Sequence, residues 1–166
     1  MAERRLVLMR HAKSAWPEAT ADTQRPLAER GCRDAPAAGS WLRDHVAGVD
    51  LVVSSPALRA RQTWELVAPE LNPPPEVRLD ERVYGASAET LLGVIQELPQ
   101  QAATVLVIGH NPGLEELVEL LTGAVEPLKT SAIAVLDGPP AWADAAPRSF
   151  ALTERVAREV EYGNHR

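Results

Sequence analysis

The sequence has a single cysteine, Cys32, among its 166 residues, so no disulfide bond can form within the chain. It also lacks any run of about 18 apolar residues, the length that a membrane-spanning helix needs. We expect no signal peptide, because the apolar run that begins at Leu6 is short and leads directly into Arg10. These absences fit a reducing compartment, and we expect a cytoplasmic protein.

Positive charge is not in excess either, since 17 basic residues face 23 acidic ones and the net charge is −6. Nucleic acids and anionic membranes are therefore not expected partners, and any bound anion must be attracted by a local cluster. The sequence contains no H-E-x-x-H metal motif and no phosphate-binding loop with a Walker lysine. We accordingly expect no metal and no cofactor.

What the chain does contain is an alternation of short apolar runs with amphipathic segments, in a length suited to one domain over residues 1–166. This alternation predicts an α/β fold with three layers, α/β/α, around a mostly parallel central sheet. Pro36 is expected to kink or interrupt the first helix. The expected strands span 4–9, 51–53, 76–79, 104–109, 131–136 and 149–153, and the expected helices 27–46, 57–69, 88–98 and 114–121.

Three strand ends carry residues suited to chemistry. Arg10 and His11 directly follow the first strand, and His110 follows the fourth. The second strand leads into Ser55, the expected N-cap of a helix whose first turns hold Arg59. Parallel strands present their carboxyl ends at the same edge of a sheet, where α/β proteins bind their ligands. We therefore expect these side chains to converge.

Two imidazoles and two guanidinium groups at one edge suit phosphoryl transfer. Guanidinium groups bind phosphoryl oxygens through paired hydrogen bonds, and their charge lowers the pKa of a nearby imidazole. A neutral imidazole can attack phosphorus in line and form a phosphohistidine, which water then hydrolyses. The second imidazole can stabilise charge on the transferring group. Arginines would here take the role that Mg²⁺ has elsewhere, so a metal-independent phosphatase is predicted.

The motifs themselves resemble those of a known family. RHAKS at 10–14, SSPALRARQT at 54–63 and GHNPG at 109–113 occur in the order and spacing of the histidine phosphatase superfamily, whose fold is phosphoglycerate-mutase-like. The short chain, with Ala12 where many members have glycine, is similar to the SixA branch. The resemblance implies a phosphatase that acts on phosphohistidine carried by a protein.

The resemblance also implies roles for single residues. His11 would be the nucleophile, Arg10 and Arg59 would bind the phosphate, and His110 would stabilise the transition state. Arg61 lies beside the pattern and is expected to be structural.

The general acid is less defined. DERVYGAS at 80–87 resembles the stretch of mutases in which a glutamate donates the proton, so Glu81 is the candidate. SixA-like proteins often lack a clear acid, and acidic residues are common in solvated loops. If Glu81 is the acid, Glu81→Gln should impair alkyl phosphate hydrolysis and leave phosphohistidine turnover nearly intact.

The expected partner is a phosphorylated protein, such as a histidine phosphotransfer domain, or else a small phosphate ester. One alternative is a small-molecule phosphatase or mutase of the same superfamily. Another is a phosphate-binding module without turnover, although such a module would need the arginines and not the nucleophile. A zinc hydrolase that uses His11 and His110 would need a third ligand, and none is visible at metal-binding spacing.

Overall fold

The computed structural model describes residues 2–156 and places six strands in one sheet, in the order β3-β2-β4-β1-β5-β6. β3, β2, β4 and β1 run parallel to one another, whereas β5 is antiparallel to both β1 and β6. The predicted mostly parallel sheet is therefore confirmed. The strands are β1 (Arg4–Arg10), β2 (Leu51–Ser54), β3 (Glu76–Leu79), β4 (Thr104–Gly109), β5 (Ile133–Gly138) and β6 (Ala151–Val156).

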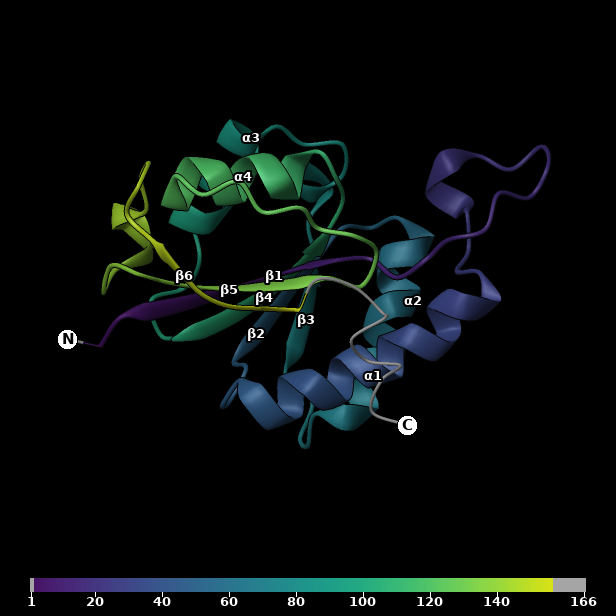
Figure 1. Cartoon of the computed structure of the whole chain (residues 1–166), viewed down its shortest axis with the longest axis horizontal. Helices are drawn as coiled ribbons and strands as arrows, with labels where there is room; N and C mark the ends of the chain where they lie inside the picture. Colours follow the sequence, from purple (N-terminus) through teal and green to yellow (C-terminus); the bar gives the residue numbers. More distant parts are fainter. Residues whose placement is uncertain (1, 157–166) are drawn as a thin grey trace.

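Helices cover both faces of this sheet (Figure 1). Buried side chains of α1 and α2 pack on one face, and those of α3 and α4 pack on the other. The three-layer α/β/α architecture is thus also confirmed. The helices are α1 (Glu29–His45), α2 (Leu58–Val67), α3 (Ala88–Gln96) and α4 (Gly113–Thr122), and the short 3-10 helices are η1 (Asp22–Gln24), η2 (Ala68–Glu70), η3 (Glu81–Val83) and η4 (Trp142–Asp144).

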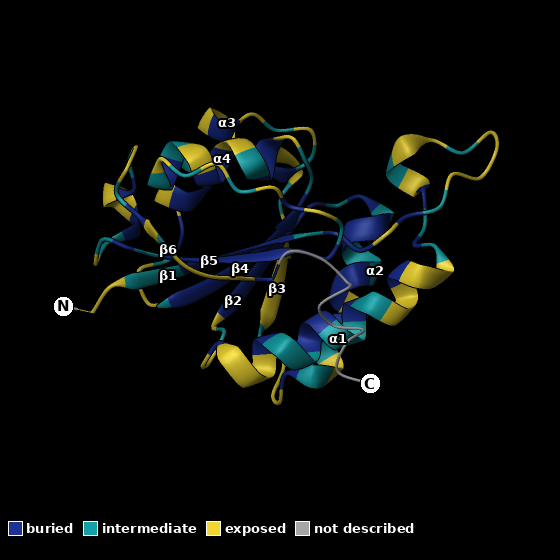
Figure 2. Cartoon of the chain, in the orientation of Figure 1, coloured by how far each residue is buried: buried dark blue, intermediate teal, exposed yellow. Residues whose placement is uncertain are grey.

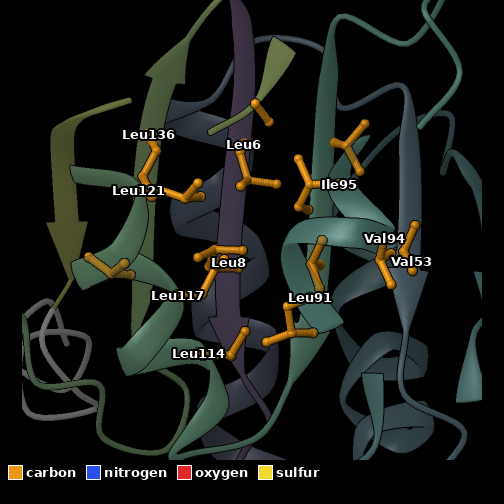
Figure 3. Packing of buried hydrophobic residues seen from close by; sticks show 14 of the residues in the cluster. Leu6, Leu8, Val53, Leu91, Val94, Ile95, Leu114, Leu117, Leu121 and Leu136 are labelled. Atoms are coloured by element: carbon orange, nitrogen blue, oxygen red, sulfur yellow. The ribbon is translucent and has the colours of Figure 1, made fainter. Parts of the chain in front are cut away.

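The central strand β1 shows why its sequence is a continuous apolar run. Successive side chains of a strand point to opposite faces, and here both faces are covered by helices. Leu6 and Leu8 lie in the cluster formed with α3 and α4, while Val7 and Met9 lie in the cluster formed with α1 and α2. Figure 3 shows the first of these clusters, and Figure 2 shows the buried centre of the sheet.

Pro36 does not interrupt the first helix, as the sequence had suggested it could. α1 runs without a break from Glu29 to His45. A proline inside a helix removes one backbone hydrogen bond and costs about 3 kcal/mol. Ala35, Ala38 and Leu42 on the same helix are fully buried against the sheet. Tertiary packing of this face outweighs the local penalty.

The segment between β1 and α1 projects from the body at the carboxyl end of β1 (Figure 1). Its base is closed by a bridge between Ser14 and Leu27, and Ala28 donates its N–H to the Lys13 carbonyl oxygen (2.8 Å). A Cβ at Gly31 would lie 2.1 Å from that same oxygen, so only glycine allows α1 to approach this closely. The start of α1 therefore fixes the chain just beyond the first histidine motif. No helix among residues 2–156 is long and apolar enough to cross a membrane.

Candidate active site

The sheet order brings three of the predicted strand ends to one edge. β1 and β2 pair in parallel with β4 from its two sides, so the carboxyl ends of all three strands lie at the same edge. The His11 and His110 rings follow β1 and β4, with their centroids 5.1 Å apart and their planes inclined by 56°. Residues separated by almost a hundred positions in the sequence thus face the same small volume.

Backbone contacts determine which nitrogen of His11 is available for attack. Nδ1 lies 2.7 Å from the Ala12 carbonyl oxygen, which can only accept a hydrogen bond. Nδ1 therefore carries the proton, and Nε2 keeps its lone pair. Thr63 of α2 holds the same turn, because its Oγ1 accepts from the Ala12 N–H (2.9 Å) and donates to the Arg59 carbonyl oxygen (2.7 Å).

Both imidazoles are held in the neutral form. Burial, together with the nearby His110, Arg59 and Arg10, lowers the pKa of His11 to about 3. Burial and then Arg59 lower the pKa of His110 to about 4. Neighbouring arginine charge is the cause expected from the sequence, but burial is the larger cause at both residues. A nearly buried imidazole, 6% exposed at His11, is thus a base that stays unprotonated well below neutral pH.

Ser55 connects the second motif to the third. Its Oγ lies 2.7 Å from His110 Nε2 and accepts a hydrogen bond from the Ala57 N–H (3.1 Å). If the hydroxyl donates to Nε2, both of its hydrogen-bonding roles are filled and Nδ1 of His110 carries the ring proton. Ser55 is not the N-cap of the following helix, as the sequence suggested, since α2 begins at Leu58 with Ala57 at that position. The hydroxyl of Ser55 instead bonds to His110, a residue distant in the sequence. Local capping rules do not include such a partner.

The two arginines reach this edge, and each has a buried Nε–H that is left unpaired. Arg10 Nη1 donates to the Leu128 carbonyl oxygen (3.2 Å), and Arg59 donates through Nη1 and Nη2 to the Asp22 carbonyl oxygen (2.7 Å) and carboxylate (3.1 Å). Arg10 Nε, Arg59 Nε and His110 Nδ1 are buried without a partner in the described part of the chain.

Unpaired buried donors are unfavourable, at about 1–3 kcal/mol each, unless a ligand satisfies them. Three of them from three strand ends form a site for an anion with several acceptor oxygens. Arg61, two residues after Arg59, donates instead to the Pro56 carbonyl oxygen (2.9 Å), as a structural residue would.

Asp22 is a site residue that the sequence analysis missed. Its Oδ2 accepts from the Tyr84 hydroxyl (2.5 Å) and from Arg59, and its Oδ1 accepts from Arg25 Nη1 (3.0 Å). These three hydrogen bonds, from Tyr84, Arg25 and Arg59, hold the pKa of Asp22 well below its usual range. The aromatic ring of Tyr84 meets His110 edge-on, with centroids 5.5 Å apart. No recognised motif contains Asp22, and only its contacts reveal it.

Glu81, the candidate general acid, is not brought into this cluster. It opens η3, is exposed, and its carboxylate makes no hydrogen bond or ion pair with the residues that the structure describes. From the same sequence stretch, Tyr84 reaches the site instead. Within residues 2–156, no group of three or more His, Cys, Asp or Glu side chains could hold a metal ion.

The lowered pKa values predict how the two histidines respond to acid. We expect the ring signals of His11 and His110 in NMR spectra to remain those of neutral imidazole down to about pH 5. Their folded-state pKa values, about 3 and about 4, lie below the ordinary value of 6.5. The unfolded chain therefore binds more protons between those limits, and the free energy of unfolding should fall as the pH falls through this window.

The measurement is urea unfolding at pH 7 and pH 4.5, in the wild type and in His110→Asn. A smaller loss of stability is expected in the variant, because it has one fewer buried imidazole to protonate. Titration of either ring near its ordinary pKa would contradict the prediction.

Comparisons with known proteins agree with this geometry. A family model described as the histidine phosphatase superfamily (branch 1) matches residues 6–119. An uncharacterised protein of Mycobacterium tuberculosis H37Rv is 43% identical over 155 residues, covering 87% of this chain and 96% of its own. Phosphohistidine phosphatase SixA of Escherichia coli K12 is 37% identical over 131 residues, covering 76% and 81%. A solved structure of the protein histidine phosphatase SixA complexed with tungstate has a TM-score of 0.82 and 28% identity, covering 98% and 99%.

Proposed function

Because the chain belongs to the histidine phosphatase superfamily, in its SixA-like branch, we propose that it removes the phosphoryl group from phosphohistidine on a protein through an intermediate on His11. The observation that carries the proposal is the set of three unpaired buried donors beside a neutral imidazole. A tetrahedral oxyanion satisfies such a set, and the related SixA structure contains tungstate, an oxyanion of that shape. A phosphate-binding module without turnover is set aside, since such a module would need the arginines but not the nucleophile, and both histidines are present.

In the first step, the lone pair of His11 Nε2 attacks phosphorus. A bond forms between Nε2 and phosphorus while the bond from phosphorus to the leaving group breaks, and its electron pair departs with that group. The Nε–H groups of Arg10 and Arg59 and the Nδ1–H of His110 donate to the phosphoryl oxygens. These donors are already in place before the reaction, so they stabilise the transition state without reorganisation.

In the second step, water attacks the phosphorylated imidazole. A bond forms between the water oxygen and phosphorus, the bond to Nε2 breaks, and the electron pair returns to Nε2. The proton of the water passes to the solvent or to a phosphate oxygen. His11 Nδ1 keeps its proton throughout, because the Ala12 carbonyl oxygen holds it (2.7 Å). The imidazole therefore leaves as a neutral ring in each cycle.

The leaving group is what favours phosphohistidine over an ester. An alkoxide needs a proton as it departs, usually from a general acid. Asp22 is held ionised by its three donors, and the Tyr84 hydroxyl already donates to it. The exposed Glu81 carboxylate makes no hydrogen bond or ion pair within residues 2–156 that would position it. A protonated imidazole ring leaves without further proton transfer, so a site without a poised acid suits it.

Turnover of two substrates tests the proposal. The wild type should hydrolyse a phosphohistidine-bearing histidine phosphotransfer domain, in the presence of EDTA, with kcat/KM at least about 10²-fold above that for an alkyl phosphate. This ratio corresponds to about 2.7 kcal/mol of transition-state discrimination. Faster turnover of the alkyl phosphate would contradict the proposal and support the small-molecule alternative.

Glu81→Gln separates these two functions. For the proposed function, kcat/KM should change less than about threefold on either substrate, because Glu81 would bind neither leaving group. A loss confined to the alkyl phosphate would identify Glu81 as the acid of an esterase. The variant keeps the size of the side chain, so thermal unfolding should match the wild type and serves as the control.

A further inference from the structure

We propose that the Asp22 carboxylate binds the ring N–H of the departing imidazole, and so selects phosphoimidazole groups over phosphate esters. This inference rests on the proposed function and adds a subsite for the leaving group. Asp22 belongs to η1, on the projecting segment between β1 and α1 (Figure 1). None of the three motifs assigns it a role, and its contacts with Arg59 and Tyr84 place it at the edge of the phosphate site.

Asp22 lies on the side from which the substrate must approach. His11 is 6% exposed, whereas the Asp22 side chain is 47% exposed. In-line displacement places the leaving group opposite the nucleophile. With the nucleophile at the buried end, the leaving group lies at the exposed end. Asp22 is bound to the outer nitrogens of Arg59, Nη1 and Nη2, while the unpaired Nε remains for the phosphoryl group.

The carboxylate keeps an acceptor position for the substrate. A carboxylate can accept about four hydrogen bonds. Oδ2 receives Tyr84 and Arg59, but Oδ1 receives only Arg25. A ring N–H of the substrate can therefore bind Oδ1 without displacing any existing partner. The surrounding donors also fix the position of the carboxylate, so little freedom is lost when the substrate binds.

A negative charge beside a phosphate site otherwise needs an explanation. Asp22 opposes the charge of Arg59 and repels the phosphoryl group itself, which weakens the binding of every phosphate. Arg25 and Arg59 offset part of this repulsion, and a positive charge that the substrate brings to the same place offsets more of it. A phosphohistidine whose second ring nitrogen is protonated brings such a charge, whereas an alkyl phosphate does not. Esters with an additional carboxylate, such as phosphoglycerates, are repelled further.

The chemistry requires no proton transfer in the first step. His11 Nε2 forms its bond to phosphorus as the substrate P–N bond breaks, and that electron pair stays on the substrate nitrogen. The second ring nitrogen keeps its proton, held by Asp22, so the product is a neutral imidazole and not an imidazolate. The substrate ring and the His11 ring thus keep a proton in the same way. Asp22 holds the proton of the substrate ring, and the Ala12 carbonyl oxygen holds that of His11.

Asp22→Asn tests the subsite, with N-phosphoimidazole and p-nitrophenyl phosphate as probes. The variant keeps the shape and an acceptor oxygen but loses the charge. Loss of the Asp22–Arg59 ion pair should lower kcat/KM for both probes. We expect the fall for N-phosphoimidazole to exceed that for p-nitrophenyl phosphate by at least about tenfold. Glu18→Gln is the matched control: it removes one negative charge from the same segment, where Glu18 is exposed, and should leave both values unchanged.

A pH profile provides a second readout. An opposite charge favours the protonated ring, so the alkaline limb of kcat for N-phosphoimidazole should lie at lower pH in Asp22→Asn, by about one unit. Tyr84→Phe removes one donor and keeps the carboxylate. It should therefore retain the preference for N-phosphoimidazole and the wild-type position of that limb, even if its stability is reduced.

The outcomes separate this inference from the function on which it rests. Equal losses on both probes in Asp22→Asn would mean that Asp22 only holds Arg59. No change on either probe would mean that Asp22 has no role. Either result overturns the proposed subsite and leaves the proposed phosphatase function in place. A wild type that hydrolyses p-nitrophenyl phosphate but not N-phosphoimidazole would overturn the proposed function and the subsite together.

Discussion

Replacement of His11 by asparagine is expected to lower phosphatase activity by about 10⁴-fold or more and to abolish the phosphoenzyme. Asparagine retains a polar side chain but has no basic lone pair that could attack phosphorus. The other contacts of the site remain, so phosphate binding should be affected far less than turnover. The measurement combines steady-state kinetics with quenching of the enzyme in alkaline SDS during turnover, followed by peptide mapping of the acid-labile phosphate at alkaline pH.

The matched control for this variant is His45→Asn. His45 lies at the end of α1, is exposed, and stacks on Trp41 with ring centroids 4.4 Å apart. Its replacement should leave turnover and phosphoenzyme formation unchanged. If the label maps to a residue other than His11, or persists in His11→Asn, then the intermediate forms elsewhere and the assigned nucleophile is wrong.

Arg59→Lys is expected to reduce kcat/KM by about 10²–10³-fold, although the positive charge is kept. The guanidinium group performs two tasks that one ammonium group cannot perform together. Nη1 and Nη2 hold Asp22, and the buried Nε remains unpaired for a phosphoryl oxygen. A lysine in this place has a shorter reach and no fixed geometry of donors. Both KM and kcat should be affected, because the contact exists in the bound substrate and strengthens in the transition state.

Arg61→Lys is the corresponding control on the same helix. Arg61 donates to the Pro56 carbonyl oxygen, and within residues 2–156 its side chain makes no hydrogen bond or ion pair with a site residue. The change should therefore alter kcat/KM less than about threefold. If both substitutions have effects of equal size, general disturbance of α2 explains the loss, and the assignment of Arg59 to the phosphate has no support.

The sheet and its catalytic edge follow from local patterns in the sequence. A strand covered on both faces needs apolar side chains throughout, so Leu6–Met9 and Val105–Ile108 are recognisable as central strands without further information. Parallel strands end at a common edge, which is why residues that follow them were expected to meet. Pro36 shows the limit of local rules, because buried contacts of the same helix outweigh its penalty.

The environment of the site could not be predicted in the same way. Asp22 contacts Arg59 and Tyr84 across sequence separations of 37 and 62 residues, and no spacing rule connects such positions. Ser55 was assigned a local capping role, yet its hydroxyl binds His110 at a separation of 55 residues. The lowered pKa values depend mainly on burial, a quantity that exists only once all layers are assembled.

The sequence by itself determined the strands, the family motifs and the residues offered at the carboxyl edge, since each of these depends on neighbours along the chain. The tertiary structure alone decided which donors remain unpaired, which nitrogen of His11 is free, and that Asp22 rather than Glu81 lies beside the phosphate site. These properties depend on atoms that the fold brings together from distant segments, and on the water that it excludes from between them.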